Sequence, residues 1–159
     1  MIFRGRYEDE VGLFRPYLTA DVLSPANKWV EVDFLVDTGA DETFLDFRFI
    51  KKFNIDTRGI DVKDDVGGVG GSGVPYFQID SALKLISPGG TKVFKGKINI
   101  FLDPHSSEVP LLGRDVLDNF VSIFDRKQNS ILLLDEKEQY KVSVQPSGIS
   151  NQLTAKGME

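Results

Sequence analysis

Short apolar segments separated by Gly, Pro, Asn and Asp recur along the chain, and this pattern predicts a mostly β protein. The most regular segment is residues 28–36, where apolar and more polar side chains alternate and so occupy opposite faces of a strand. The apolar face comprises Val30, Val32, Phe34 and Val36. Residues 14–23 form the preceding apolar segment, and a Ser-Pro-Ala-Asn turn at 24–27 joins the two. The sequence therefore predicts a hairpin that ends at Asp37.

The rest of the chain predicts more strands and short helices. Three further apolar segments are expected to form strands: 75–85, 91–102 and 121–134, the last with a turn at 125–130. Phe47, Ile50 and Phe53 recur near helical spacing, and Asp46 is placed to cap the first turn. Residues 114–120 follow a glycine and predict a second short helix.

Length and composition predict one soluble domain without structural staples. The chain has 159 residues and no cysteine, which excludes disulfides and thiolate metal sites. A single histidine, His105, excludes a multi-histidine metal centre, so we expect no metal and no cofactor. The net charge of −5 without a basic cluster argues against nucleic acid as the main partner. No apolar run has the length of a signal peptide or a membrane span, so we expect a cytoplasmic protein that does not enter a membrane.

The domain organisation expected from these patterns has three parts. Residues 1–13 are assigned as an N-terminal extension and residues 14–144 as the folded domain. Residues 145–159 are rich in polar residues, Gly and Pro, and predict a mobile tail.

Asp37-Thr38-Gly39 is the first motif that could carry chemistry. A stiff strand runs directly into an aspartate on a tight turn, which fixes the carboxylate in space. Gly39 allows a close approach by a substrate or a second backbone. The same triplet is also typical of an ordinary turn at a strand end, so it does not establish a catalytic site by itself.

The second motif is the glycine-rich segment 64–73. It contains Gly68, Gly70 and Gly73 in the spacing Gly-x-Gly-x-x-Gly, so a dinucleotide-binding loop has to be considered. That loop needs a helix after its last glycine to hold phosphate, whereas a strand-like segment containing Pro75 follows here. The alternatives that remain are a hairpin tip that closes over a cleft, with Val69 at its apex, and a simple surface turn.

The third motif is residues 109–117, where an apolar pair and a glycine lead into the second predicted helix. In the simplest interpretation it is a buried strand that enters a helix. Gly113 would in addition let the chain pass close to another loop, and Arg114 would be directed back toward the site.

In this order, the three motifs resemble those of the retropepsins, the single-domain aspartic proteases of retroviruses and their cellular and bacterial relatives. The resemblance covers roughly residues 14–135 and is closer to cellular and bacterial members than to viral ones. It implies a closed, mostly β barrel with one or two short helices that forms a homodimer, and it implies an aspartic endopeptidase that cleaves polypeptides.

The resemblance also implies roles for individual residues. Asp37 would be the catalytic aspartate, Thr38 would bond to its counterpart across the dimer, and Arg114 would pair with Asp41. The residues implied to contact substrate are Gly39, Ala40 and Asp41 in the catalytic turn and Gly68, Val69 and Gly70 in the flap tip. Leu112 and Gly113 would support the catalytic turn from below.

Peptide hydrolysis without a metal or a covalent intermediate needs a water activated on one side and a carbonyl group polarised on the other. Two carboxylates that share one proton can do both. The chain has one Asp-Thr-Gly and no Asp-Ser-Gly. The second carboxylate must then come from another molecule, and a twofold homodimer with Asp37 at its axis is the simplest solution.

Two alternatives have to be weighed against a protease. A strand that ends in Asp-Thr-Gly also suggests phosphoryl transfer of the haloacid-dehalogenase type, but that chemistry wants a second Asp where this chain has Gly39, and an α/β pattern. The other alternative is a non-catalytic module of retropepsin fold that dimerises or binds peptides. The intact Asp37, Thr38 and Gly39 favour the enzyme.

Overall fold

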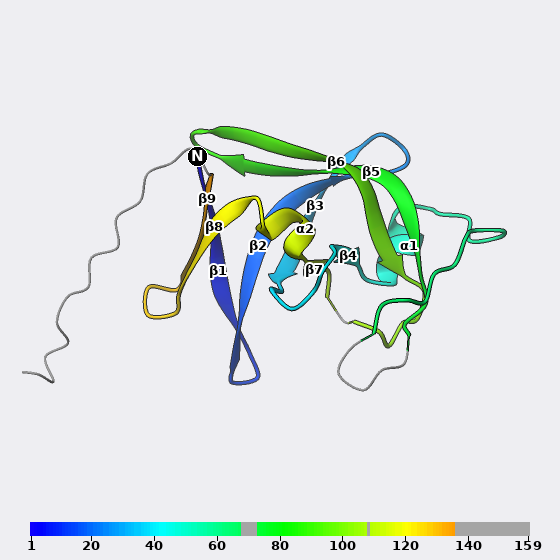
Figure 1. The fold of residues 1–159 in the computed structure, drawn as a ribbon, viewed down its shortest axis with the longest axis horizontal. Coiled ribbons are helices and arrows are strands. Elements are labelled where there is room, and N and C mark those ends of the chain that lie inside the picture. Colours follow the sequence, from blue (N-terminus) through cyan, green and yellow to red (C-terminus); the bar gives the residue numbers. More distant parts are fainter. Residues whose placement is uncertain (68–72, 108, 136–159) are drawn as a thin grey trace, which may run out of the picture.

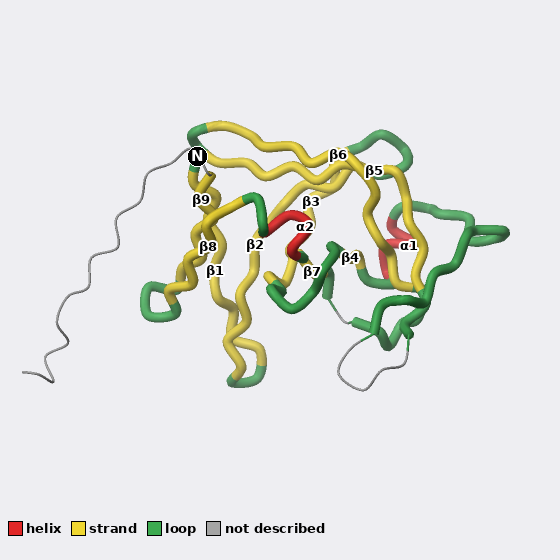
Figure 2. The backbone as a smooth tube through the Cα atoms, viewed as in Figure 1, coloured by secondary structure: helices red, strands yellow, loops and turns green. Residues whose placement is uncertain are grey.

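The chain folds into a mostly β structure with two short helices, as the sequence predicts (Figures 1 and 2). The computed structural model describes residues 1–67, 73–107 and 109–135. Its strands are β1 (Ile2–Glu10), β2 (Leu13–Leu23), β3 (Trp29–Val36), β4 (Phe44–Leu45), β5 (Tyr76–Ser87), β6 (Gly90–Phe101), β7 (Leu111–Leu112), β8 (Phe120–Asp125) and β9 (Ser130–Asp135). The helices are α1 (Arg48–Lys52) and α2 (Arg114–Leu117).

The described strands belong to one nine-stranded sheet with the order β3-β7-β4-β6-β5-β2-β1-β9-β8. In addition, β2 pairs back with β3, so the strand at one end of this order also contacts a strand in its middle. Figure 1 shows the short strands β4 and β7 near the middle of the molecule, between β3 and the long β5–β6 hairpin. The closed barrel expected from the resemblance stays a prediction.

The hairpin that delivers Asp37 forms as predicted. β2 and β3 pair antiparallel from Tyr17 opposite Leu35 to Leu23 opposite Trp29. Along β3 the predicted inner face is largely buried, with Phe34 completely so, while Glu31 and Asp33 are exposed. The alternating pattern therefore identifies both the strand and the face that it buries.

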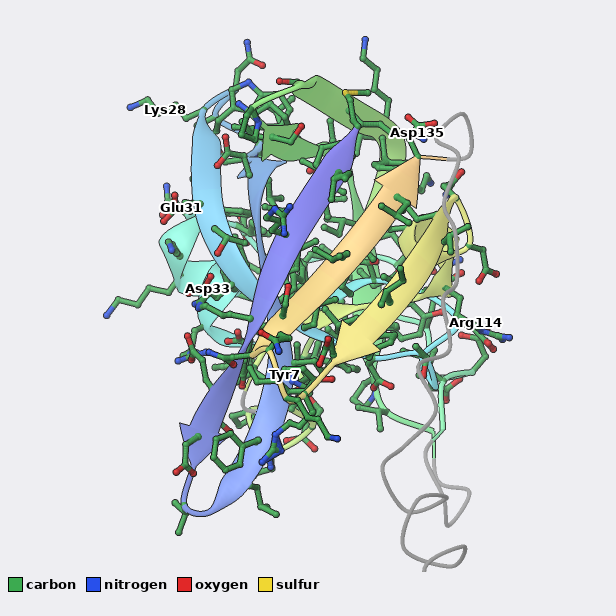
Figure 3. All side chains as sticks on the ribbon, turned by 90° about the vertical axis from the view of Figure 1, so that its left-hand side faces the viewer. Tyr7, Lys28, Glu31, Asp33, Arg114 and Asp135 are labelled. Atoms are coloured by element: carbon green, nitrogen blue, oxygen red, sulfur yellow. The ribbon has the colours of Figure 1, made fainter. Side chains whose placement is uncertain are left out.

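Residues 1–13, expected as an N-terminal extension, contain the strand β1. It pairs antiparallel with β2, where Arg6 lies opposite Tyr17, and with β9, where Phe3 lies opposite Leu133. Figure 3 shows β1, β9 and β8 side by side. Phe3 is 1% exposed and packs edge-to-face on Phe120 at 5.6 Å between ring centroids. The domain boundaries stay predictions, and residues 145–159 lie outside the described residues.

Both predicted helices form, and the second is shorter than expected. Phe47 occupies the N-cap position of α1, and the carboxylate of Asp46 accepts hydrogen bonds from the backbone and side chain of Arg48. The helix α2 ends at Leu117 instead of continuing to residue 120. Its end is fixed by Asn119, whose side-chain amide donates to the carbonyl groups of Asp115 and Val116, both at 3.0 Å.

Side chains from the whole sheet meet in one main core. Its largest fully buried members include Phe3, Phe34, Phe77, Leu45 and Ile100. A second, smaller cluster of Phe44, Tyr76 and Phe101 lies apart from it. Within the described part of the chain, no helix has the length and apolar character needed to cross a membrane.

Candidate active site

Asp37 is held at the carboxyl end of β3 by the parallel strand β7. Its backbone N–H donates to the carbonyl oxygen of Leu112 at 3.0 Å, directly after the register pair of Val36 and Leu112. Both of these residues are buried, at 5% and 0% exposure. The main chain on either side of Asp37 therefore has little freedom to move.

The turn after Asp37 is closed by hydrogen bonds to that residue. Asp37 Oδ1 accepts from the N–H of Gly39 at 2.9 Å, and the Asp37 carbonyl accepts from the N–H of Ala40 at 3.2 Å. A Cβ atom at Gly39 would lie 3.2 Å from Asp37 Oδ1, which is tighter than an ordinary contact. Thr38 and Gly39 are exposed, and Asp37 is half-buried. The turn thus orients the carboxylate and leaves its neighbours accessible.

The start of α2 supports this turn from below. The N–H groups of Arg114 and Asp115 donate to the carbonyl oxygens of Ala40 and Asp41, at 2.9 and 3.1 Å. The guanidinium of Arg114 donates to the carboxylate of Asp41, and this hydrogen bond raises the pKa of Arg114 above its ordinary value. Figure 3 shows Arg114 at the edge of the molecule in that view. The structure therefore brings Arg114 and Asp41 together.

The buried residues Gly113 and Thr43 and the exposed Asp115 connect the loop after Asp37 to the start of α2. A Cβ atom at the buried Gly113 would lie 2.4 Å from the carbonyl carbon and oxygen of Glu42. The hydroxyl of Thr43 donates to Asp115 Oδ1 at 2.7 Å and accepts from the N–H of Gly113 at 3.1 Å. Thr43 is 3% exposed. Sequence reasoning did not assign Thr43 or Asp115 to the site, although each can satisfy a backbone N–H near a turn.

A cleft of about 650 Å³ opens at Asp37. Its lining residues are Asp37, Gly39, Ala40, Asp41, Glu42, Phe44, Asp65, Val66, Gly67, Val74, Tyr76, Phe101, Ser106 and Leu111. Asp37, the turn that follows it and the residues on either side of the glycine-rich segment thus face one space. A polypeptide side chain fits a cavity of this size.

Another wall of the cleft is a short two-stranded structure of residues 63–67 and 73–76. We name it the flap base after the flap that the resemblance to retropepsins implies. Lys63 and Tyr76 exchange two backbone hydrogen bonds of 2.8 Å, and Val74 N–H donates to the Val66 carbonyl at 2.8 Å. The predicted flap-tip residues Gly68, Val69 and Gly70 lie outside the described residues.

Tyr76 links the flap base to the apolar part of the cleft. Its ring meets Phe44 edge-to-face at 5.2 Å, and Phe44 stacks on Phe101 at 4.4 Å between ring centroids. Its hydroxyl donates to Asp65 Oδ1 at 2.6 Å. Burial and this hydrogen bond raise the pKa of Tyr76 to about 12, and the same bond lowers the pKa of Asp65.

Glu42 lines the cleft beside Asp41, and a buried amide holds its side chain. Asn99, 3% exposed on β6, donates from Nδ2 to Glu42 Oε2 at 2.7 Å. Asn99 Oδ1 accepts in turn from Gln78 Nε2 at 2.9 Å. Sequence reasoning missed this group, because Asn99 lies in a strand segment without any recognisable motif. Among the described residues, no group of three or more His, Cys, Asp or Glu side chains could hold a metal ion.

Comparison with known proteins identifies the fold. No family model and no curated protein matches the chain. Among solved structures, it is similar to a retropepsin-like aspartic protease from Rickettsia conorii, with 21% identity, 84% of this chain and 91% of that chain covered, and a TM-score of 0.55. EIAV protease in complex with the inhibitor HBY-793 is also similar, with 21% identity, coverage of 70% and 91%, and a TM-score of 0.43.

The chain therefore has a retropepsin-like fold, and the predicted similarity to retropepsin-like aspartic proteases is confirmed. Of the two structures, the bacterial one matches better, as expected. The phosphoryl-transfer alternative required an α/β architecture, and the described residues form a mostly β fold instead.

Proposed function

We propose that the chain is an aspartic endopeptidase that acts as a homodimer, with Asp37 from each subunit forming the catalytic pair. The observation that carries this proposal is the position of Asp37. It lies at the end of a buried strand, on the wall of the 650 Å³ cleft, within a retropepsin-like fold. One chain supplies one such carboxylate, so the second is contributed by the partner subunit across a twofold axis.

The chemistry follows from two carboxylates in close proximity. Two adjacent negative charges repel each other, so one carboxylate of the pair acts in its protonated form and the other in its ionised form. The ionised Asp37 takes a proton from a water molecule as that water attacks the peptide carbonyl carbon. The protonated Asp37 donates to the carbonyl oxygen, and the tetrahedral intermediate then collapses with protonation of the leaving amine.

The substrate lies across the twofold axis as an extended strand. Main-chain groups of Gly39 and Asp41 bind its backbone. The apolar part of the cleft accepts a bulky apolar side chain, because Val66, Val74 and Leu111 line it and are partly exposed over the buried cluster of Phe44, Tyr76 and Phe101.

Substitution of the proposed catalytic residue tests this function. A peptide library is digested at mildly acidic and at neutral pH with the wild type, Asp37→Asn and Asp80→Asn, and products are identified by mass spectrometry. Asp80 is an exposed carboxylate on β5 outside the cleft, so its variant controls for the loss of one charge. We expect cleavage by the wild type and by Asp80→Asn, and none by Asp37→Asn, with folding and dimerisation retained in all three.

Cleavage that survives in Asp37→Asn would overturn the proposal. If no variant cleaves but peptides still bind, a non-catalytic peptide-binding module of the same fold replaces the enzyme as the better interpretation.

A further inference from the structure

The charge of the cleft is one-sided. Its described lining includes the carboxylates of Asp37, Asp41, Glu42 and Asp65, and no Lys, Arg or His belongs to that lining. A cleft with one sign of charge and apolar walls raises the local concentration of ligands of the opposite sign. The occupant of this space is therefore expected to carry positive charge.

The carboxylates differ in how far their charge is compensated. Asp41 is paired with the guanidinium of Arg114, and Asp65 accepts a hydrogen bond from the Tyr76 hydroxyl and is also stabilised by the nearby positive charge of Lys63. In the proposed function, the Asp37 carboxylate acts on the water and on the peptide carbonyl group, so it is not a binding site for a substrate cation. Glu42 receives a hydrogen bond only from the neutral amide of Asn99 among the described residues, so its negative charge has no cation beside it.

The position of Glu42 is nevertheless well defined. Asn99 is buried, its Nδ2 also contacts the Thr43 carbonyl at 3.2 Å, and its Oδ1 is fixed by Gln78. Thus both ends of the amide are engaged, and Nδ2 faces the catalytic-turn loop. An acceptor that is already oriented loses little side-chain entropy when it binds a ligand.

We propose that the cleft selects polypeptides with a Lys or Arg side chain near a bulky apolar one, and that Glu42, positioned by Asn99, binds this cation. The apolar side chain packs on Val66, Val74 and Leu111, which cover the buried aromatic cluster. This inference rests on the proposed function for its link to cleavage. Because a twofold dimer presents two copies of Glu42, the preference for a cation applies on both sides of the scissile bond.

The test uses sets of synthetic peptides that share a central pair of Phe residues. In each set, one flanking position on one side of this pair is varied among Lys, Gln and Glu. We expect the wild type to cleave the Lys peptide of at least one set with a higher kcat/KM than the Gln peptide, and the Glu peptide most slowly. The Lys preference decreases as salt is added, because the interaction is electrostatic.

Three variants assign the preference to Glu42. In Glu42→Gln the ratio of kcat/KM for the Lys and Gln peptides falls roughly fivefold, as for the loss of one partly exposed ion pair. Asn99→Ala lowers the same ratio mainly through KM, because the carboxylate is no longer held in place. Asp80→Asn removes a charge outside the cleft and leaves the ratio as in the wild type. If Asn99→Ala does not fold, the Glu42→Gln result decides.

Binding of the same peptides to Asp37→Asn, measured by fluorescence anisotropy, separates this inference from the proposed function. A Lys preference in binding that Glu42→Gln abolishes supports the inference, even if no peptide is cleaved and the protease assignment fails. Equal binding of the Lys, Gln and Glu peptides, or a Lys preference that persists in Glu42→Gln, overturns the inference even if the protein is a protease.

Discussion

Gly113 packs directly against the backbone of Glu42, where the segment before α2 meets the loop that carries Asp37. We predict that Gly113→Ala lowers the free energy of unfolding by about 1–3 kcal/mol, the range for a side chain forced into a packed interior. The new Cβ atom would lie 2.4 Å from the carbonyl carbon and oxygen of Glu42, so backbone rather than a mobile side chain must shift. Because Glu42 and Asp37 belong to one loop, turnover should also fall. Urea denaturation and a cleavage assay measure the two effects.

The matched control for this change is Gly96→Ala on β6. A Cβ atom at Gly96 would have nothing within 4 Å, so we expect a change of less than about 0.5 kcal/mol. Equal destabilisation of both variants would show that the contact with Glu42 is not what restricts residue 113.

At the scale of single residues, the sequence predicts those members of the candidate site that belong to short motifs in a characteristic order along the chain. Asp37 and Arg114 occur in short motifs, and hydrogen bonds join the turn that follows Asp37 to Arg114. Glu42 and Asn99 meet because β4 and β6 run parallel with Phe44 opposite Asn99. No local pattern specifies that register, so the contact could not be predicted from the sequence.

At the scale of elements, the predicted strands are those with a clear alternation or a clear turn. The hairpins of β2 with β3, β5 with β6 and β8 with β9 all belong to this class. In contrast, β1 is rich in charged residues and buries only Phe3 fully, so its sequence carries no strand signal. β4 and β7 have two residues each, and their pairing partners define them rather than their own sequence.

The flap base yields a prediction about pH. Burial and the hydrogen bond to Asp65 raise the pKa of Tyr76 from an ordinary value of 10 to about 12. The folded state therefore keeps the proton of the Tyr76 hydroxyl up to a higher pH than the unfolded chain does. The resulting stabilisation is complete below pH 10 and disappears as the pH rises toward about 12. We expect Tyr76→Phe to remove one late-ionising tyrosine from an ultraviolet titration and to weaken the flap base, with slower turnover.

The control for this experiment is Tyr17→Phe. Burial and a hydrogen bond to Glu10 also raise the pKa of Tyr17 to about 12, but Tyr17 lies on β2 and does not line the cleft. This variant should also remove one late-ionising tyrosine while turnover stays normal. If both variants slow turnover equally, the link between Tyr76 and Asp65 has no specific role in the flap base.

At the scale of the whole molecule, one copy of Asp37 per chain makes oligomeric state part of the proposed mechanism. In the proposed mechanism each chain supplies one carboxylate of the catalytic pair. The described lining of the cleft at Asp37 has no second Asp-Thr-Gly turn that could supply the other. The subunit interface could not be predicted from the sequence, because interface residues follow no periodic pattern within one chain.

A subunit-mixing experiment tests whether activity needs two Asp37 residues. Wild type and Asp37→Asn are mixed in equal amounts and allowed to exchange subunits. Random pairing returns a quarter of all dimers as wild-type pairs, so the activity of the original wild type falls to about half. A monomeric enzyme would retain its full activity in the same mixture. Asp80→Asn replaces Asp37→Asn in a parallel mixture and should cause no loss, since its exposed carboxylate lies outside the cleft. A fall to half in the mixture with Asp37→Asn, and no loss in the mixture with Asp80→Asn, would therefore assign the second catalytic carboxylate to the partner subunit.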